Sequence, residues 1–310
     1  MSRPFLPELS SPWTAPAICY GPHRDGQHPG GASPSEAELR EDLTILARHW
    51  KLVRLYGAVG PCEALLRLIA EEQVPLQVLL GAWIAPESSA GDAGHVVPDP
   101  EAIAANRREI ETAIRLANAY PEIVVGVSVG NETQVFWSAH RSPEEQLVSY
   151  LREVRAHTAV PITTADDWNF WRLPESAAIA NEIDFLLVHA HPLWNGIQLD
   201  AALDWTSARL AEIRATHPGR RIVLGEIGWA TGRHTEGEQA RLIKGATGEA
   251  EQAEFIHALS AWIPREQVVT FVFEAFDENW KGGPHPDEVE KHWGLYHTNR
   301  QPKPALSGKR

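Results

Sequence analysis

Short apolar runs alternate with long amphipathic stretches about eight times from residue 17 onward, and this alternation constrains the fold more than any other feature. Most of the runs are almost continuously apolar, as expected of parallel β-strands that are covered on both faces. The stretches between them have helical spacing, so the rhythm is that of repeated β/α units. We expect strands over residues 17–20, 52–56, 75–80, 123–129, 161–165, 184–190, 221–224 and 268–276.

The amphipathic stretches also carry the start signals of helices. Ser35 stands three residues before Glu38, and Ser142 precedes Pro143 and Glu145. In a capping box of this kind, the side chains satisfy backbone donors that the first helical turn leaves free. Helices are therefore expected over residues 36–50, 62–73, 144–157 and 200–216, and along the stripe of Ile103, Ile110, Ile114 and Ala117.

Eight strands that are each followed by a helix predict a closed (β/α)8 barrel rather than a doubly wound sheet. A doubly wound sheet normally has a Gly-rich phosphate turn after its first strand, and the turn here reads Gly-Pro-His-Arg-Asp-Gly. We expect a single α/β barrel over residues 17–310 with a C-terminal tail, preceded by an N-terminal extension over residues 1–16. The long polar loops 81–99 and 277–292 follow the third and eighth strands, where such a barrel builds its active site.

Charge and cysteine content narrow the classes of partner. With 28 basic and 41 acidic residues the net charge is -13, and the basic residues are scattered, so we expect no nucleic-acid partner. Cys19 and Cys62 are too few for a disulfide framework and are expected to be free thiols.

No apolar stretch approaches the roughly 20 residues that span a bilayer, and Met1–Trp13 lacks the features of a secretory signal. We expect a cytoplasmic monomer, or a periplasmic or membrane-tethered protein if the chain was cut from a longer one.

Two carboxylates stand directly after buried apolar runs, where a charge is difficult to solvate. Glu132 follows the fourth expected strand and Glu226 follows the seventh. The ends of these strands face each other across an eight-stranded barrel, and cleavage of a glycosidic bond with retention needs two carboxyl groups about 5–5.5 Å apart. Asn131 could hydrogen-bond a sugar hydroxyl, and Trp229 could offer a platform for a sugar ring.

The sequences around both carboxylates resemble the acid/base and nucleophile motifs of glycoside hydrolase family 17, the β-1,3-glucanases and β-1,3-glucan transglycosylases. Val129-Gly130-Asn131-Glu132 is similar to the first motif, and Glu226-x-Gly228-Trp229 is similar to the second. Thr133 after Glu132, and Ala230-Thr231 after Trp229, depart from the usual plant pattern. These departures look like the bacterial branch of the family.

The resemblance extends over nearly the whole chain. Phe273–Lys281, followed by Glu290–Leu295, looks like the region of the family's eighth strand, which carries an acidic-Lys-acidic cluster. That cluster maps onto Glu278, Lys281 and Glu290. Ile18-Cys19-Tyr20 and Val53-Arg54-Leu55-Tyr56 are similar to the family's first two strands. The resemblance implies that the following residues bind substrate: Tyr20, Arg54, Tyr56, Glu278 and Lys281.

Tryptophan is frequent in this chain, with 12 residues, and many of them follow the ends of expected strands. Aromatic side chains at the rim of a barrel can stack on sugar rings, although some must instead pack loops together. The tryptophans at such positions are Trp83, Trp137, Trp168, Trp171, Trp194, Trp229 and Trp280. Among them, we assign Trp137, Trp168, Trp229 and Trp280 to substrate binding.

Three further acidic residues lie at strand ends. Asp166 and Asp167 follow the fifth strand and could either bind hydroxyl groups or cap the next segment. Glu274 alternates with Phe273 and Phe276 on the eighth strand, so it is expected to face the site and to support a catalytic carboxylate.

His189 and His191 lie on one face of the sixth strand with the spacing of a mononuclear zinc site. A metal-dependent amidohydrolase would carry this motif on its first strand, which lacks it here. We therefore expect no metal and no cofactor, and place His191 in a substrate subsite. A non-catalytic carbohydrate-binding barrel is the other alternative, but it would not need both Glu132 and Glu226.

The residues together predict double displacement on a β-glucan. Glu226 attacks the anomeric carbon while protonated Glu132 releases the leaving group, and Glu132 then deprotonates water or a sugar hydroxyl. Arg54 and Lys281 are candidates for balancing the carboxylate charges.

Overall fold

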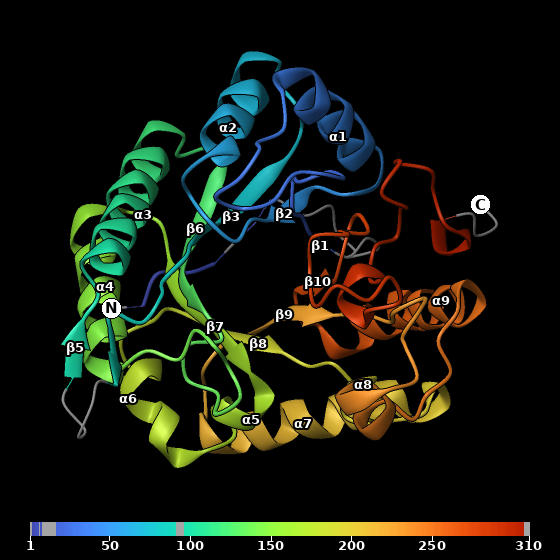
Figure 1. The fold of residues 1–310 in the computed structure, drawn as a ribbon. Helices are drawn as coiled ribbons and strands as arrows, with labels where there is room; N and C mark the ends of the chain where they lie inside the picture. The colour runs from blue at the N-terminus through green and yellow to red at the C-terminus, as the bar shows by residue number, and fades with distance from the viewer. Residues whose placement is uncertain (1, 6, 8–16, 91–95, 307–310) are drawn as a thin grey trace.

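The computed structural model describes residues 2–5, 7, 17–90 and 96–306 of the chain, and its centre is a closed barrel of eight parallel strands. Around the barrel the strands follow the order β1-β10-β9-β8-β7-β6-β3-β2. Helices form a ring outside them (Figure 1). The predicted (β/α)8 barrel is confirmed. Its strands are β1 (Ala17–Cys19), β2 (Leu52–Arg54), β3 (Gln77–Ala82), β6 (Val124–Asn131), β7 (Ile162–Asp167), β8 (Leu186–His189), β9 (Ile222–Ile227) and β10 (Thr270–Val272).

Every predicted strand and helix overlaps an element of the structure. The helix α9 was not predicted, although Phe255, Leu259, Trp262 and Ile263 mark its buried face. The α-helices are α1 (Glu36–His49), α2 (Pro61–Glu71), α3 (Pro100–Ala119), α4 (Glu144–His157), α5 (Trp168–Trp171), α6 (Ala177–Ala180), α7 (Ala202–Thr216), α8 (Gly237–Leu242) and α9 (Glu249–Glu266).

One of the two predicted helix caps is confirmed. The hydroxyl oxygen of Ser35 accepts a hydrogen bond from the Glu38 backbone N–H at 3.3 Å, and the Glu38 carboxylate accepts one from the Ser35 N–H at 2.7 Å. The expectation at the start of α4 was wrong. Pro143 occupies the cap position there, so Ser142 lies one residue too early, and its hydroxyl donates to the carbonyl of His140.

The two long loops differ in their regularity. The loop after β3 contains the antiparallel pair β4 (Ser88–Ala90) and β5 (Val96–Pro98), where irregular structure was expected. Residues 91–95 of that loop lie outside the described residues. The loop after β10 contains only one short 3-10 turn, Val289–Lys291.

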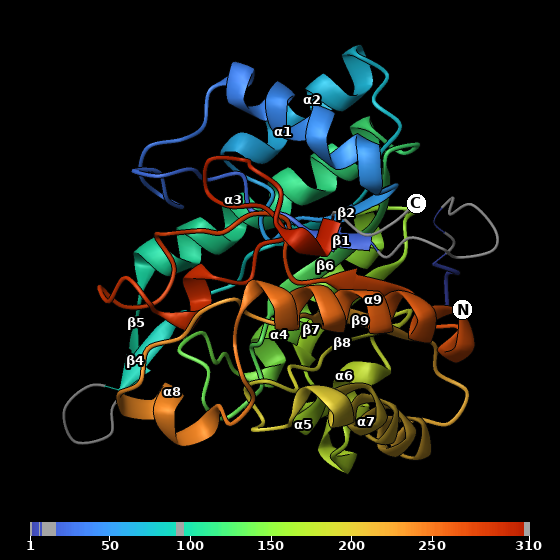
Figure 2. The ribbon, with the colours of Figure 1, turned by 90° about the vertical axis from the view of Figure 1, so that its right-hand side faces the viewer.

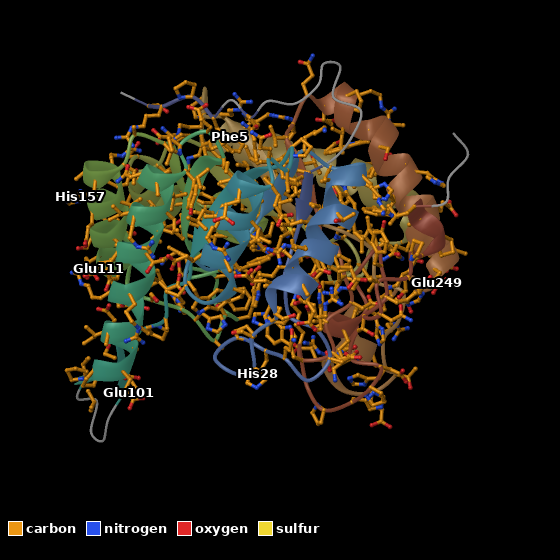
Figure 3. All side chains as sticks on the ribbon, turned by 90° about the horizontal axis from the view of Figure 1, so that it is seen from above. Phe5, His28, Glu101, Glu111, His157 and Glu249 are labelled. Atoms are coloured by element: carbon orange, nitrogen blue, oxygen red, sulfur yellow. The ribbon has the colours of Figure 1, made fainter. Side chains whose placement is uncertain are left out.

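The two ends of the barrel are occupied differently, as the view from above shows. His28 and Glu101 lie at one end and Phe5 at the other (Figure 3). Glu101 is in the first turn of the helix that follows β3, so its end holds the C-terminal ends of the strands. Phe5 is buried and stacks on Phe185 with ring centroids 4.4 Å apart. Phe5 therefore packs on the end opposite the expected active site.

The C-terminal segment is tied to the barrel by buried ion pairs and runs beside α9 (Figure 2). Arg300 donates two hydrogen bonds to Asp42 of α1, at 2.9 and 2.8 Å. The ammonium of Lys303 donates to Asp277 at 2.8 Å and to the Thr231 hydroxyl at 3.0 Å. Arg300 thus joins this segment to α1, and Lys303 joins it to the loops that follow β9 and β10.

Two expectations about the chain as a whole can be compared with the described residues. Cys19 and Cys62 are buried free thiols, as predicted. None of the helices in the described part of the chain has the length and apolar character needed to cross a membrane.

Candidate active site

Glu132 and Glu226 lie at the C-terminal ends of β6 and β9, the fourth and seventh strands of the barrel. The chain turns sharply at the first of them, since Gly130 has a φ of +77° and Glu132 a φ of +50°. A non-glycine residue in this left-handed region costs about 1–3 kcal/mol and persists only where the surroundings enforce it. Here the Glu132 N–H donates to the Ala165 carbonyl at 2.8 Å, which holds the turn against β7.

One imidazole contacts both carboxylates. Nδ1 of His189 lies 2.9 Å from Oε1 of Glu132, and Nε2 of the same ring lies 3.3 Å from Oε1 of Glu226. His189 is fully buried at the end of β8, between the two catalytic candidates in the barrel wall. The structure therefore brings the two predicted carboxylates to opposite sides of a single histidine ring.

Glu226 is enclosed by hydrogen-bond donors. Its Oε1 accepts from Arg54 at 3.0 Å and from the Tyr56 hydroxyl at 2.8 Å, while Oε2 lies 3.0 Å from Nε2 of His191. Burial alone would raise the pKa of the Glu226 carboxyl, but the hydrogen bond from His191 and the guanidinium of Arg54 hold that pKa well below its usual range. Glu226 is therefore ionised despite being buried.

Arg54 is the cation at the centre of this cluster. Its guanidinium is buried on β2 and donates to Glu226, to the Gly225 carbonyl at 2.9 Å and to Oδ1 of Asn131 at 2.6 Å. The direct contact between Arg54 and Glu226 supports the charge-balancing role inferred for Arg54. Because Asn131 uses its amide oxygen to accept from the guanidinium, this bond also fixes the orientation of the Asn131 side chain, which directly precedes Glu132.

A second buried cluster lies on the loop after β10. Lys281 Nζ is 2.6 Å from both Glu278 and Glu274, so it pairs with the first acidic residue of the expected cluster and with Glu274 in place of Glu290. Burial would lower the pKa of Lys281, but the two carboxylates raise it well above its usual value. A Cβ on Gly21 would collide with the Glu278 carboxylate and would have to displace it from its ion pair with Lys281. Glu290, the third expected member of the cluster, accepts instead from the indole N–H of Trp194 at 2.9 Å.

The exposed aromatic side chains are fewer than the sequence suggested. Trp137 is 48% exposed on the loop that begins at Glu132, and its neighbour Phe136 is 80% exposed. Their rings meet edge to face with centroids 4.8 Å apart. Trp280 is 39% exposed, and its indole N–H donates to Glu278 at 3.0 Å. These side chains can offer ring faces to a ligand.

Two predicted substrate contacts were wrong. Trp229 is only 1% exposed, because its ring packs on Phe255 of α9 and its indole N–H donates to the Ala246 carbonyl. Tyr20 is equally buried, and its hydroxyl donates to Asp42 at 3.0 Å. Both side chains belong to the packing between the barrel and its outer helices.

Two further residues serve structure. Trp168 is buried edge to face against Trp205 of α7, under the guanidinium of Arg209. Asp166 is fully buried and accepts hydrogen bonds from the backbone N–H groups of Gln134 and Asp167. The capping interpretation holds for Asp167, whose carboxylate accepts from the Asn169 N–H at the start of α5, whereas Asp166 binds the loop after β6 instead. The platform expected of Trp168 was wrong.

Sequence reasoning missed the place of His189 and used it only for a metal alternative. Both histidines of the His-x-His pair instead contact Glu226, and His189 also contacts Glu132. Within the described ranges, no group of three or more His, Cys, Asp or Glu side chains is arranged to hold a metal ion. The sequence did contain a signal, because the two histidines lie on the same face of one strand. We interpreted that spacing as typical of metal ligands, whereas it places both rings against the catalytic candidates.

A closed β/α barrel whose fourth and seventh strands end in two carboxylates is the architecture of a glycoside hydrolase. The sequence profile of the BtgE/BtgC glycoside hydrolase domain matches residues 17–294. The chain therefore belongs to the BtgE/BtgC glycoside hydrolase domain family, and the resemblance to glycoside hydrolase family 17 is confirmed.

Similar proteins support this assignment. A glucan 1,3-beta-glucosidase of Arthroderma benhamiae is 29% identical over 294 residues, covering 89% of this chain and 86% of that protein. An endo-laminarinase from Formosa has a similar structure, with a TM-score of 0.76, 24% identity and coverage of 92% of this chain and 84% of that one. A glycoside hydrolase family 17 beta-1,3-glucanosyltransferase from Rhizomucor miehei gives a TM-score of 0.73 at 22% identity, covering 94% and 96%.

The chain spans about 40% of the length of several Aspergillus relatives named btgC. These relatives and that of Arthroderma are fungal, so the bacterial branch inferred from the motifs is not confirmed.

Proposed function

We propose that this protein is a retaining β-1,3-glucan hydrolase and transglycosylase, with Glu226 as nucleophile and Glu132 as acid/base. The observation that carries the proposal is the difference between the two carboxylates. The Glu226 side chain is 7% exposed and surrounded by Arg54, Tyr56 and His191, whereas that of Glu132 is 29% exposed. Environments that differ in this way keep one carboxyl ionised for attack and leave the other free to exchange protons with a ligand.

The reaction follows from this arrangement in two steps. Glu226 attacks the anomeric carbon while Glu132 gives its proton to the glycosidic oxygen, so the carbon–oxygen bond to the leaving group breaks as the glycosyl–enzyme ester forms. Glu132 then removes a proton from water or from a sugar hydroxyl, which attacks the same carbon and releases Glu226. Two inversions give net retention of the β configuration.

The substrate class is proposed from the relatives. Their names describe glucan 1,3-beta-glucosidases, endo-1,3-beta-glucosidases, a laminarinase and a beta-1,3-glucanosyltransferase, and the profile match covers the whole barrel. Hydrolysis and transfer share the same glycosyl–enzyme, so one site serves both. The monomeric state and the boundary between residues 1–16 and the barrel stay predictions.

Incubation with a β-1,3-linked glucose pentaose should test this function. We expect shorter oligosaccharides by mass spectrometry, and NMR of the first products should show the new reducing end in the β configuration before mutarotation. Initial α products would contradict the retaining mechanism. The absence of any cleavage of β-1,3-linked oligosaccharides would contradict the function itself.

We further propose that Trp137 holds the acceptor sugar for transfer. The acid/base acts on the leaving-group side of the bond, and Trp137 is an exposed ring on the loop that starts at that residue. An acceptor held there reacts at an effective concentration that can rival water at about 55 M. Stacking on an aromatic ring contributes about 0.5–1.5 kcal/mol, or roughly 2- to 13-fold in occupancy.

Trp137→Ala should therefore lower the ratio of transfer to hydrolysis by about 2- to 13-fold while donor consumption changes less. The ratio is read from products longer than the pentaose donor at millimolar concentration. Leu173→Ala, which removes another exposed apolar side chain, is the control and should leave the ratio unchanged. An unchanged ratio in Trp137→Ala would remove Trp137 from the acceptor site, and a wild-type protein that makes no longer products would refute transfer.

A further inference from the structure

The protonation of His189 can be read from its partner Arg54. A terminal nitrogen of the guanidinium lies 2.8 Å from Nε2 of the imidazole, and both groups are buried. A guanidinium has only donors, so Nε2 must be the acceptor and cannot carry a proton. The proton of the neutral ring is therefore on Nδ1, where it donates to Oε1 of Glu132 at 2.9 Å.

The remaining neighbours of the ring agree with this tautomer. Oε1 of Glu226 lies 3.3 Å from Nε2. The same Arg54 nitrogen also lies 2.9 Å from the Gly225 carbonyl and 3.0 Å from this oxygen, so its two hydrogens are shared among three acceptors, of which Nε2 is the nearest. The ring of His191 is 6.4 Å away, centroid to centroid, and its Nε2 is engaged with the other oxygen of Glu226. Arg54 thus contacts Glu226 directly and reaches Glu132 through one neutral imidazole.

We infer that His189 is a positioning residue that transmits the positive charge of Arg54 to Glu132 when the negative charge moves there. The inference rests on the proposed double displacement. Before reaction the charge is on Glu226, which Arg54 contacts. In the glycosyl–enzyme, Glu226 is a neutral ester and Glu132 has become the carboxylate, because its proton has gone to the leaving group. Arg54 polarises His189, and the Nδ1–H then stabilises that carboxylate.

The same bond selects the oxygen that carries the proton. Oε1 of Glu132 accepts from His189, so in the protonated acid Oε1 is the carbonyl oxygen and Oε2 bears the hydrogen. Oε2 gives this proton to the glycosidic oxygen in the first step and takes one from water or a sugar hydroxyl in the second. His189 exchanges no proton with the substrate in either step.

Two substitutions test the roles of the two ring nitrogens separately. In His189→Asn the amide N–H occupies the place of Nδ1 and keeps the bond to Glu132. In His189→Gln the longer amide takes the place of Nε2, which keeps a contact with Arg54 and loses the one to Glu132. Two aryl β-laminaribiosides, one with a good leaving group (2,4-dinitrophenyl) and one with a poor one (4-methoxyphenyl), report on the need for acid assistance.

For His189→Gln we expect kcat/KM to fall by about 100-fold with the poor leaving group and by less than about 5-fold with the good one, since a good leaving group needs little protonation. His189→Asn, which keeps the bond to Glu132 but loses the one from Arg54, should fall by no more than about 10-fold with the poor leaving group and by less with the good one. Thermal melting of each variant identifies losses that come from unfolding, which would lower both rates together.

Equal losses on the two glycosides in a folded His189→Gln would overturn the inference, as would a His189→Asn no better than His189→Gln on the poor leaving group. Either result would leave the proposed function standing if the wild type cleaves both glycosides. A wild type that cleaves neither would overturn the function and this inference together.

Discussion

Glu226→Gln should lower kcat on β-1,3-linked oligosaccharides by about 10⁴-fold or more, equivalent to about 5.5 kcal/mol in the barrier. The amide keeps the shape of the carboxyl group but cannot attack the anomeric carbon. The donors Arg54, Tyr56 and His191 lie within 3.0 Å of the Glu226 carboxylate, which shows how fully the site is built around a negative charge. Initial rates measure the loss in kcat, and calorimetric titration with a β-1,3-linked triose measures sugar binding separately.

Glu254→Gln is a matched control, because it makes the same change at an exposed position on α9. It should leave kcat within about twofold, as expected of a surface substitution away from the site. A Glu226→Gln protein that keeps more than about a tenth of the wild-type kcat would have lost less than about 1.4 kcal/mol, and the nucleophile would then have to be another residue.

Glu132→Ala should lower turnover of an unactivated substrate by about 10²- to 10⁴-fold, the usual contribution of a general acid/base. A dinitrophenyl glycoside should still form the glycosyl–enzyme, since its leaving group needs no proton, and deglycosylation should then stall. Azide needs no base, so it should restore turnover and yield a β-glycosyl azide. The product's anomeric configuration is read by NMR.

Glu226→Ala gives the opposite stereochemistry and so serves as the control. Azide would there replace the missing nucleophile and attack the β-glycoside directly, which gives an α-glycosyl azide. An α product from Glu132→Ala, or no rescue by azide at any concentration, would show that Glu132 is not the acid/base.

The barrel and the two catalytic candidates could be predicted from the sequence because each depends on local patterns. Parallel strands buried on both faces are nearly continuous apolar runs, so all eight were found. A carboxylate placed directly after such a run has few structural reasons to be there, which singled out Glu132 and Glu226. The helix α9 was not predicted, although its buried face has regular helical spacing.

Side-chain direction was the part that the sequence could not supply. Tyr20 and Trp229 follow strand ends, as expected, but whether a side chain turns to the barrel axis or to the outer helices depends on tertiary contacts with α1 and α9. Glu132 has a left-handed backbone conformation, which the sequence usually signals by a glycine. Because the residue is a glutamate, nothing in the sequence predicted this conformation. The role of His189 depends on Arg54, which is 135 residues away in the chain.

Because Lys303 and Asp277 form a buried ion pair, the order in which the chain is synthesised affects when the active-site loop is anchored. Asp277 precedes Glu278, and the loop that carries Glu278 and Lys281 is anchored through it to a residue near the end of the described chain. A nascent chain acquires both catalytic candidates long before it acquires Lys303. The ribosome thus adds Lys303 only after both catalytic candidates, so a barrel whose Lys303 has not yet been made has its two carboxylates but lacks the ion pair that anchors the loop after β10.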